Sequence, residues 1–546
     1  MNTTQTSLFL MILLSLFSLS ASADHLTIGN GVEVATLDPH KAQGVAESNV
    51  LRDLFEGLVI TNRRSDIVPG NALHWQTNDH QHYRFTLRDD IFWSNGEPVT
   101  AQDYVYSWRR AVDPNTASPY AWFLSAAHIR GAQAIIDGAS PVSALGVKTE
   151  GPHSLLVELD RPVPYFVHML AHTSFLPVHQ KTIQRFGDHW TQPQHIVTNG
   201  AFLLLEWVIN ERLELGRNPS YWDHANTKLE QVTYLALDNP ISEMYRFMTG
   251  EIDLTSTVPL EHYTRLRREQ PESLLHKPNL CTEFYQFNTL RPPLNDVRVR
   301  QALAYAIDRN VLTERLLAQG QIPAYHLIPP TTQDAPNWQP ALANLTQSRR
   351  DSFARQLFAQ AGYTKDRPLH LTLLYNTSDS IKKIALAISA MWQSTLPVKV
   401  ELLNQEWKSY LSSTRLGEYQ IARMGWCADY NEASAFLSYL ASDALGGKYY
   451  RNRLYDSLLE KASRADTTTK RVHFYQQAEE HLWGTMPLIP LYFGVTNRLA
   501  TPRLKGYDPG YPAALYSKDL SLQPPPPKTP SVNAPQTTSK PLPNDN

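Results

Sequence analysis

Two separate stretches of this 546-residue chain carry the pattern of a strand, a helix and a second strand. The first stretch, residues 232–254, has alternating apolar residues, then a helical apolar repeat that ends at Gly250, then alternation again. Its apolar positions are Val232 and Tyr234, then Ile241, Met244, Tyr245 and Met248, then Ile252 and Leu254. Such units build parallel sheets through right-handed crossovers.

The second stretch, residues 369–402, repeats this pattern more than a hundred residues later, and Pro397 ends its helix. Its apolar positions are Leu369, Leu371 and Leu373, then Ile381, Ile384, Ala385, Ile388, Met391 and Trp392, then Val398, Val400 and Leu402. Because the two units are so far apart, we predict an α/β protein with two lobes.

The segment before the first unit has a different character. Tyr83, Phe85 and Leu87 alternate, Asn95-Gly96 indicates a tight turn, and residues 100–103 resemble a capping box that starts a helix. We therefore predict a smaller α+β insertion over roughly residues 57–180.

The amino terminus has the features of a secretory signal. Residues 8–19 form an uncharged apolar run, and Ala21-Ser22-Ala23 follows as an A-x-A pattern. The run is too short to span a membrane, so we expect export, cleavage after Ala23 and a soluble mature protein. The segment before the run lacks Lys and Arg, and the alternative is an uncleaved anchor.

The chain has two cysteines, Cys281 and Cys427. In an exported protein an even number favours a disulfide, whereas in the cytosol they would be two unrelated thiols. Metal binding is the weaker alternative, because the chain has no C-x-x-C motif.

Residues 523–546 are rich in Pro, Ser, Thr and Asn, with a proline run at 524–527. A segment with so little to bury is predicted to be a disordered or polyproline tail. A partner-binding segment is the alternative.

Signatures of catalysis and of cofactor binding are missing from the sequence. G-x-S-x-G, the Walker A loop and H-E-x-x-H do not occur, and Val34 stands where a third glycine of a dinucleotide fingerprint would lie. The formal net charge of −2 gives no nucleic-acid footprint. We expect no cofactor, no metal and no nucleic-acid partner.

One short segment does suggest a binding site. Residues 419–425 read as a strand, and Trp426, Asp429 and Tyr430 follow it. Ligands of open α/β sheets lie beyond the carboxyl ends of strands, and a carboxylate between aromatic rings suits an ammonium group. Alternatively, the two aromatic residues belong to the core and Asp429 caps a turn through Asn431.

With these residues the chain resembles the periplasmic oligopeptide-binding proteins that serve ABC importers, over residues 26–522. The motifs that carry the resemblance are LDPH (37–40), RDLFEGL (52–58), FTLRDDIFWSNGEPVTAQDYVYSW (85–108), DPNTASPYAW (113–122), VTNGAF (197–202), NPSYWD (218–223), LLYNTSD (373–379), NQEWK (404–408) and GWCADYNE (425–432).

The resemblance implies a periplasmic binding protein fold, in which two hinged lobes close over the ligand and a small α+β domain is inserted in the first lobe. It places the first lobe at residues 24–280 plus 497–522 and the second at 281–496. The implied function is non-enzymatic: a monomeric periplasmic receptor that binds short peptides and delivers them to an ABC permease in the inner membrane.

By the same resemblance, peptides bind as extended strands through backbone hydrogen bonds. Asp429 would pair with the peptide amino terminus, and the backbone of Gly425 and Cys427 would bond the peptide. Trp407, Trp426 and Tyr120 would wall the side-chain pockets, and Cys427 would be disulfide-bonded to Cys281.

The chain also departs from the family pattern. Gln43 stands where oligopeptide binders can carry an acid, and Leu317, Ile381 and Thr414 align with positions of basic groups near the peptide carboxyl end. Arg423 remains, and Arg415 lies next to one of these positions. General oligopeptides are the first expectation, and murein-peptide binding, a sensing receptor and an exported hydrolase are the alternatives.

Overall fold

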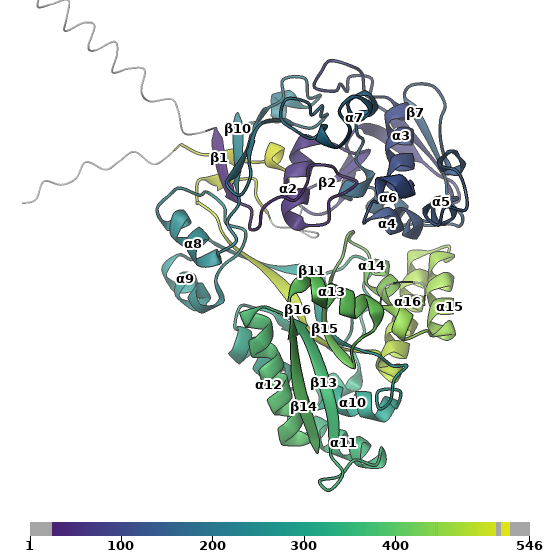
Figure 1. The fold of residues 1–546 in the computed structure, drawn as a ribbon, viewed down its shortest axis with the longest axis vertical. Coiled ribbons are helices and arrows are strands. Elements are labelled where there is room, and N and C mark those ends of the chain that lie inside the picture. Colours follow the sequence, from purple (N-terminus) through teal and green to yellow (C-terminus); the bar gives the residue numbers. More distant parts are fainter. Residues whose placement is uncertain (1–23, 443, 445, 509–514, 525–546) are drawn as a thin grey trace, which may run out of the picture.

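The computed structural model describes residues 24–442, 444, 446–508 and 515–524. Figure 1 shows two lobes, one above the other, and the predicted division into two α/β lobes is confirmed. The predicted signal at residues 1–23 lies outside the described residues, as does the predicted tail from residue 525 onward.

The first lobe is built on a four-stranded sheet with the order β1-β10-β9-β8. Its strands are β1 (His25–Gly29), β8 (Phe202–Val208), β9 (Arg212–Arg217) and β10 (Gln231–Leu235). β1 and β10 are parallel and the other pairs are antiparallel. The helices assigned to this lobe are α2 (Val45–Leu54), α3 (Ala101–Val112), α4 (Ala121–Ala126), α5 (Ala132–Ile136), α6 (Phe166–Met169), α7 (Gln180–Phe186), α8 (Pro240–Met248) and α9 (Tyr263–Glu269).

The first predicted strand–helix–strand unit is present as β10, α8 and a short continuation. Gly250 follows the helix with a left-handed φ of 79°, as expected of a residue that ends a helix. The predicted second strand is reduced to a bridge at Leu254, which pairs with Ile28 in parallel and with Ala500 in antiparallel orientation.

The predicted apolar face of α8 is wrong for most of its residues. Met244 is buried, but Ile241, Tyr245 and Met248 are 42%, 56% and 40% exposed. The helix packs through Met244 and Phe247 against a small separate cluster that includes Leu499. The apolar spacing thus predicted the position of the helix correctly. It did not predict which side of the helix is buried.

Residues within the predicted insertion form their own antiparallel sheet with the order β4-β5-β7-β6. Its strands are β4 (Ala72–Gln76), β5 (His82–Leu87), β6 (Val147–Thr149) and β7 (Ser154–Glu158), and a separate hairpin joins β2 (Val59–Thr61) and β3 (Ile67–Pro69). The tight turn at Gly96 has a φ of 85°. The helix start is confirmed as well, because the Asp103 carboxylate accepts the Thr100 backbone N–H at 2.7 Å. Whether these elements form a separate domain over residues 57–180 stays a prediction.

The second lobe contains a six-stranded sheet with the order β12-β16-β11-β15-β13-β14. Its strands are β11 (Leu274–Phe287), β12 (Ile322–Pro323), β13 (Leu369–Asn376), β14 (Val398–Gln405), β15 (Ile421–Cys427) and β16 (Leu488–Leu499). Its helices are α10 (Val297–Tyr305), α11 (Gln347–Gln360), α12 (Asp379–Thr395), α13 (Trp407–Leu416), α14 (Ser434–Leu437), α15 (Arg453–Ser463) and α16 (Thr468–Thr485). The second predicted unit is confirmed: β13 and β14 are parallel, and Ile384, Ile388 and Trp392 of the intervening α12 are buried.

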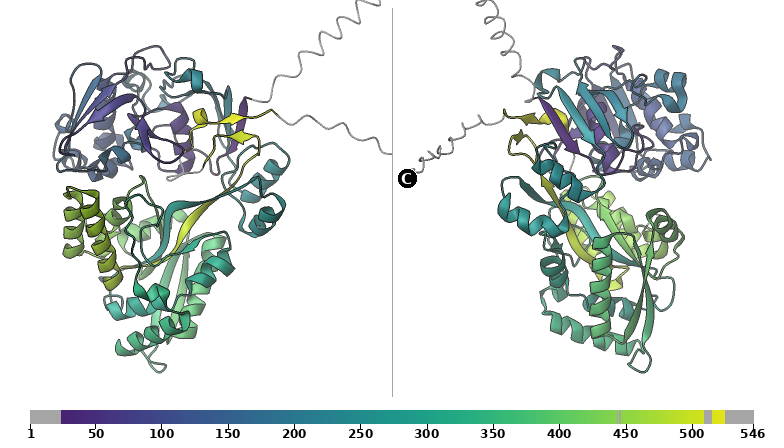
Figure 2. Two further views of the ribbon diagram at one scale, coloured as in Figure 1. Left: turned by 180° about the vertical axis from the view of Figure 1, so that it is seen from behind. Right: turned by 60° about the vertical axis from the view of Figure 1, so that its left-hand side comes forward.

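Two long strands connect the lobes. β11 and β16 pair from Leu274 with Leu499 to Gln286 with Leu488, and Figures 1 and 2 show them running from one lobe into the other. Their register shifts between Pro278 and Thr282. The predicted lobe boundaries at 280/281 and 496/497 fall within these strands, and the assignment of residues to lobes stays a prediction.

After the second crossing, the carboxyl-terminal segment packs on the first lobe. β17 (Leu504–Lys505) and β18 (Ser521–Leu522) form a small antiparallel pair. The Ser517 backbone N–H donates to the buried Asp53 carboxylate at 2.8 Å, and the Tyr234 hydroxyl donates to it at 2.7 Å. Residues near the end of the chain thus complete the core of the first lobe.

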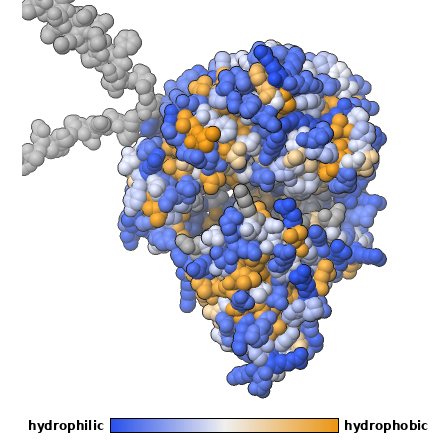
Figure 3. All heavy atoms as spheres, in the orientation of Figure 1, coloured by the Kyte–Doolittle hydropathy of each residue, from blue (hydrophilic) through white to orange (hydrophobic). Residues whose placement is uncertain are grey.

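The two lobes touch through aromatic side chains. Tyr165 of the first lobe stacks on Tyr430 of the second with ring centroids 5.7 Å apart, and Phe123 lies 6.3 Å from the same ring. On the face seen in Figure 3 the surface is hollowed between the lobes, with apolar side chains gathered along the lower one. Within the described residues, no helix is long and apolar enough to cross a membrane.

Candidate functional site

The end of β15 has an open edge. The strand pairs with β13 only at Ile421 and Ala422, whereas its pairing with β11 continues to Cys427. β13 pairs with β14 on its other side. The chain therefore moves outward from β13 to β14 and then returns across β13 to form β15. Ligands of α/β proteins bind in the crevice that opens at such a point.

Hydrogen bonds just beyond both ends of β15 show which of its residues direct their backbone N–H and C=O groups toward the open edge. Asn288 donates its N–H to the Gln420 carbonyl at 3.0 Å, and Ala428 donates to the Leu280 carbonyl at 2.8 Å. Because antiparallel pairing alternates, even-numbered residues of β15 bond to β11 and odd-numbered ones turn their backbone groups away. Gly425 and Cys427 therefore present their N–H and C=O groups to the open edge, and both residues are exposed.

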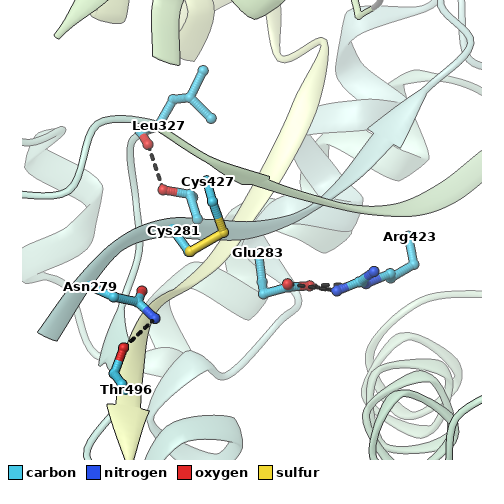
Figure 4. Close-up of a disulfide and its surroundings, with 8 residues drawn as sticks. Asn279, Cys281, Glu283, Leu327, Arg423, Cys427 and Thr496 are labelled. Atoms are coloured by element: carbon cyan, nitrogen blue, oxygen red, sulfur yellow. Dashed lines mark hydrogen bonds and ion pairs between the residues drawn. A yellow bond between two sulfur atoms is a disulfide. The ribbon is translucent and has the colours of Figure 1, made fainter. Parts of the chain in front are cut away.

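The disulfide between Cys281 and Cys427 is present. The two cysteines lie directly opposite each other on β11 and β15, as Figure 4 shows. Cys281 also falls within the register shift of β11. The disulfide therefore ties the end of the open-edged strand to a strand that connects the lobes.

Asp429 lies just beyond β15, at the contact between the lobes. Its side chain is 20% exposed, and its carboxylate accepts no hydrogen bond from any residue that the structure describes. Burial raises its pKa to about 7, and the positive charge of Arg52 opposes that rise. The capping alternative is not supported, because the Asp429 carboxylate accepts no hydrogen bond from Asn431 among the described residues. The Asn431 amide oxygen itself accepts the Gln333 N–H at 2.9 Å.

Two first-lobe residues that face Asp429 were not assigned to the site from the sequence. His172 Nε2 lies 3.9 Å from Asp429 Oδ1. His172 Nδ1 accepts the Ser174 N–H at 3.2 Å, so the ring proton is on Nε2. Burial and the Arg52 charge lower the pKa of His172 to about 3, so this neutral ring does not neutralise the carboxylate.

The second is Arg52, whose Nε is buried without a hydrogen-bond partner among the described residues. It lines a small cavity together with Asp429, Tyr430 and Asn431 of the other lobe. The RDLFEGL motif contains this arginine, so its charge was a signal that could have drawn attention to it. Larger hollows on the first lobe include neither Asp429 nor any residue of β15.

The structure places the predicted aromatic residues on both sides of the cleft. Tyr120 stacks on His172 with ring centroids 4.7 Å apart, and Asp429 is close enough to help burial raise the Tyr120 pKa. Trp426 is half-buried, and its Nε1–H donates to the Ala435 carbonyl at 2.7 Å. Tyr430 is buried, so the alternative of a core role holds for this ring.

Two other predicted residues are less informative. Trp407 begins α13, but its side chain lies outside the described part of the structure. Gln43 is exposed in the irregular segment before α2, and no contact joins it to Asp429 among the described residues.

Arg423 is held by an acidic residue that the sequence reading did not single out. Its guanidinium binds both carboxylate oxygens of Glu283, with Nη2–Oε1 at 2.6 Å and Nε–Oε2 at 2.9 Å. Glu283 lies opposite Gly425, and a Cβ on that glycine would overlap the Glu283 carboxylate. Because side chains alternate along β11, the predicted disulfide at Cys281 already implied that Glu283 lies on the same face.

The departures from the family pattern are explained by packing or exposure. Leu317 is buried in the core of the second lobe, and Ile381 packs against the same core. The Thr414 hydroxyl donates to the Leu411 carbonyl at 3.0 Å, and Arg415 is exposed. Leu317, Ile381 and Thr414 therefore supply no positive side chain at these positions.

Several of the quoted motifs hold the first lobe together. Glu56 of RDLFEGL accepts hydrogen bonds from Tyr221 and, at 2.6 Å, from Trp222 of NPSYWD. Asp38 of LDPH pairs with Arg110 at 2.6 Å. These contacts give the motifs a structural role in the first lobe, while GWCADYNE contains Gly425, Cys427 and Asp429 of the candidate site.

Known proteins resemble this chain over nearly its whole length. The model for bacterial extracellular solute-binding proteins, family 5 (middle), matches residues 66–448. The periplasmic oligopeptide-binding protein OppA of Escherichia coli (strain K12) is 44% identical over 489 residues, which covers 89% of this chain and 90% of that protein. The periplasmic murein peptide-binding protein MppA of the same strain is 43% identical and covers 90% of this chain and 91% of its own length.

Solved structures agree with these matches. The structure of the E. coli murein tripeptide-binding protein MppA has a TM-score of 0.84 at 42% identity and covers 92% of this chain and 99% of its own. Haemophilus influenzae OppA in complex with RPPGFSPFR has a TM-score of 0.81 at 38% identity, with coverages of 92% and 99%. The chain therefore belongs to the bacterial extracellular solute-binding proteins of family 5.

Proposed function

We propose that the protein is a periplasmic receptor that binds short peptides as extended strands between its lobes and delivers them to an ABC permease in the inner membrane. The observation that carries this proposal is the open edge of β15, which leads to a largely buried carboxylate that has no hydrogen-bond partner among the described residues. Added strands gain affinity from backbone hydrogen bonds without reading sequence. An enclosed carboxylate needs a positive partner, and a peptide ammonium group supplies one.

In this proposal each residue of the site has a defined role. Asp429 pairs with the peptide amino terminus, and the backbone of Gly425 and Cys427 bonds the peptide. Tyr120, Trp426 and Trp407 wall the side-chain pockets. Gln43 would lie near the start of the site, and Arg423 would lie toward the peptide carboxyl end.

Two measurements test the proposal. Protein purified from periplasm and denatured should release peptides that mass spectrometry identifies. Calorimetry on emptied protein should show binding of tetra-alanine and much weaker binding of N-acetyl-tetra-alanine. Equal affinities for the two would contradict the role of Asp429, and no binding of either would contradict the receptor proposal.

Relatives of this chain are named as binding proteins, and we propose a monomeric receptor without catalytic activity here. An exported hydrolase is the alternative of a different class. Peptide recovered intact after prolonged incubation with purified protein supports the receptor, and the appearance of cleavage products supports the hydrolase.

The similarity to MppA favours murein tripeptide as a second candidate ligand. A role in sensing is compatible with the same site. Competition between murein tripeptide and tetra-alanine in one calorimetric titration decides which ligand binds more tightly.

The mature protein is expected to start at Asp24. The apolar run at residues 8–19 and the Ala21-Ser22-Ala23 sequence direct cleavage to this position. Intact-mass analysis of a periplasmic extract checks this directly. A species that retains Met1 and sediments with membranes would contradict it.

Peptide binding is expected to stabilise the closed arrangement of the lobes. Asp429 lies on one lobe, and Tyr120 and Arg52 lie on the other, so a peptide among them contacts both. A ligand shifts a conformational equilibrium by its differential affinity for the two states. Small-angle scattering should give a smaller radius of gyration with saturating tetra-alanine than for the emptied protein, and identical profiles would contradict hinge closure.

A further inference from the structure

The ion pair between Glu283 and Arg423 lies beside the open edge of β15. The two side chains are 21% and 19% exposed, and Figure 4 shows them on the same stretch of the β11–β15 pair as the disulfide. The pair is bidentate, which is the strongest geometry available to arginine and a carboxylate. Within the cleft, a positive and a negative charge thus lie together next to Gly425.

The proposed binding mode fixes which part of a peptide comes to this pair. An amino terminus at Asp429 lies beyond the carboxyl end of β15, so the peptide runs antiparallel to the strand. Because backbone pairing alternates, a first residue opposite Cys427 places the third residue opposite Gly425. The carboxylate of a bound tripeptide therefore lies close to both Glu283 and Arg423.

We propose that Glu283 is a specificity-determining residue, which neutralises Arg423 and removes the preference of the cleft for a carboxylate at the third peptide position. This inference rests on the proposed function. A free arginine here would capture the carboxyl end of a tripeptide. The paired arginine offers no net charge, so peptides that continue past this point, or that end in an amide, are accepted equally well.

The neighbouring residues support this assignment. Leu317 and Ile381 are apolar and pack against the core of the second lobe, so they supply no second positive charge. Asn376 lies 3.5 Å from Arg423 through its amide oxygen, which accepts from the guanidinium and adds no charge. The charge balance next to Gly425 is therefore decided by Glu283 and Arg423.

The test compares trialanine with trialanine amide by calorimetry on emptied protein. Wild type is expected to bind the two within about threefold of each other. Glu283→Gln frees the guanidinium, so this variant should prefer the acid by about tenfold or more, which corresponds to about 1.4 kcal/mol. In the double variant Glu283→Gln/Arg423→Gln that preference should disappear.

Two further variants serve as controls. Glu283→Asp keeps the negative charge and should keep the wild-type ratio, and it remains informative if Glu283→Gln does not fold. Glu401→Gln removes an exposed glutamate from edge strand β14 of the same sheet and should change nothing.

The outcomes separate this inference from the proposed function. A wild-type preference of tenfold or more for the acid, or equal binding of acid and amide by a folded Glu283→Gln variant, would overturn the role of Glu283 while peptide binding stands. Failure of trialanine, its amide and tetra-alanine to bind any variant would overturn the proposed function and this inference with it.

Discussion

Replacing Asp429 with alanine is expected to weaken the binding of tetra-alanine by roughly 30-fold to several thousandfold. Removing one member of a buried charge pair costs about 2–5 kcal/mol, and each tenfold in affinity is about 1.4 kcal/mol. The cost arises because the ammonium group would be left enclosed beside neutral His172 and without a counter-charge.

A double-mutant cycle measures the interaction between Asp429 and the peptide amino group directly. Wild type and Asp429→Ala are each titrated with tetra-alanine and with N-acetyl-tetra-alanine. The substitution should cost the acetylated peptide far less than the free amine. If the two effects are simply additive, Asp429 does not hold the amino group.

Stability measurements show whether such a loss reflects unfolding. A carboxyl group whose pKa rises from about 4 to about 7 on folding binds its proton more tightly in the folded state. The ligand-free protein therefore loses stability from this group as the pH rises from about 4 to about 7. Asp429→Asn removes that penalty and should unfold at the same or a higher temperature than wild type at pH 8, while binding of the free amine is lost.

The pH dependence of binding is a second readout. Only the ionised form of Asp429 attracts the ammonium group, so affinity for tetra-alanine should fall as the pH is lowered through about 7. Binding of the acetylated peptide should not follow this profile.

The second large effect is expected from removing the disulfide. Cys281 and Cys427 are 146 residues apart in sequence, and closing a loop of that length lowers the entropy of the unfolded chain by an amount worth about 5 kcal/mol. The double variant Cys281→Ala/Cys427→Ala should therefore lose about 2–5 kcal/mol of unfolding free energy. Urea denaturation followed by tryptophan fluorescence measures this loss as a lower midpoint.

The disulfide variant also tests how the site is held. Because the disulfide ties the strand before Asp429 to β11, the variant should bind tetra-alanine more weakly even under conditions where it is fully folded. A denaturation midpoint equal to that of wild type would contradict the stabilising role. Unchanged peptide affinity would show that strand pairing alone holds the site.

The elements that could be predicted from sequence are those whose apolar spacing is satisfied locally. β13, α12 and β14 follow their alternating and helical patterns because this unit buries one helix face against its own sheet. For α8, spacing alone could not identify the buried side. That helix packs on a small cluster that includes Leu499, some 250 residues farther along the chain.

The candidate site was predictable where it lies on one segment. Gly425 and Cys427 lie on β15 and Asp429 lies two residues beyond it. Once this strand is predicted, the positions of all three residues are predicted as well. Arg52 and His172 reach Asp429 only because the lobes meet, and nothing in their local sequence specifies that contact. Glu283 depends on the register between β11 and β15, which the disulfide implies but local patterns do not.

The packing of residues 500–522 on the first lobe also affects the order in which the lobes can fold. Chains emerge from the ribosome amino end first, and domains generally fold as units in that order. Here Leu254 pairs with Ala500, and Asp53 takes its hydrogen bond from Ser517. The first lobe thus lacks part of its core until residues 500–522 have been synthesised, so it cannot be completed before the second lobe, whose strand β16 ends at Leu499.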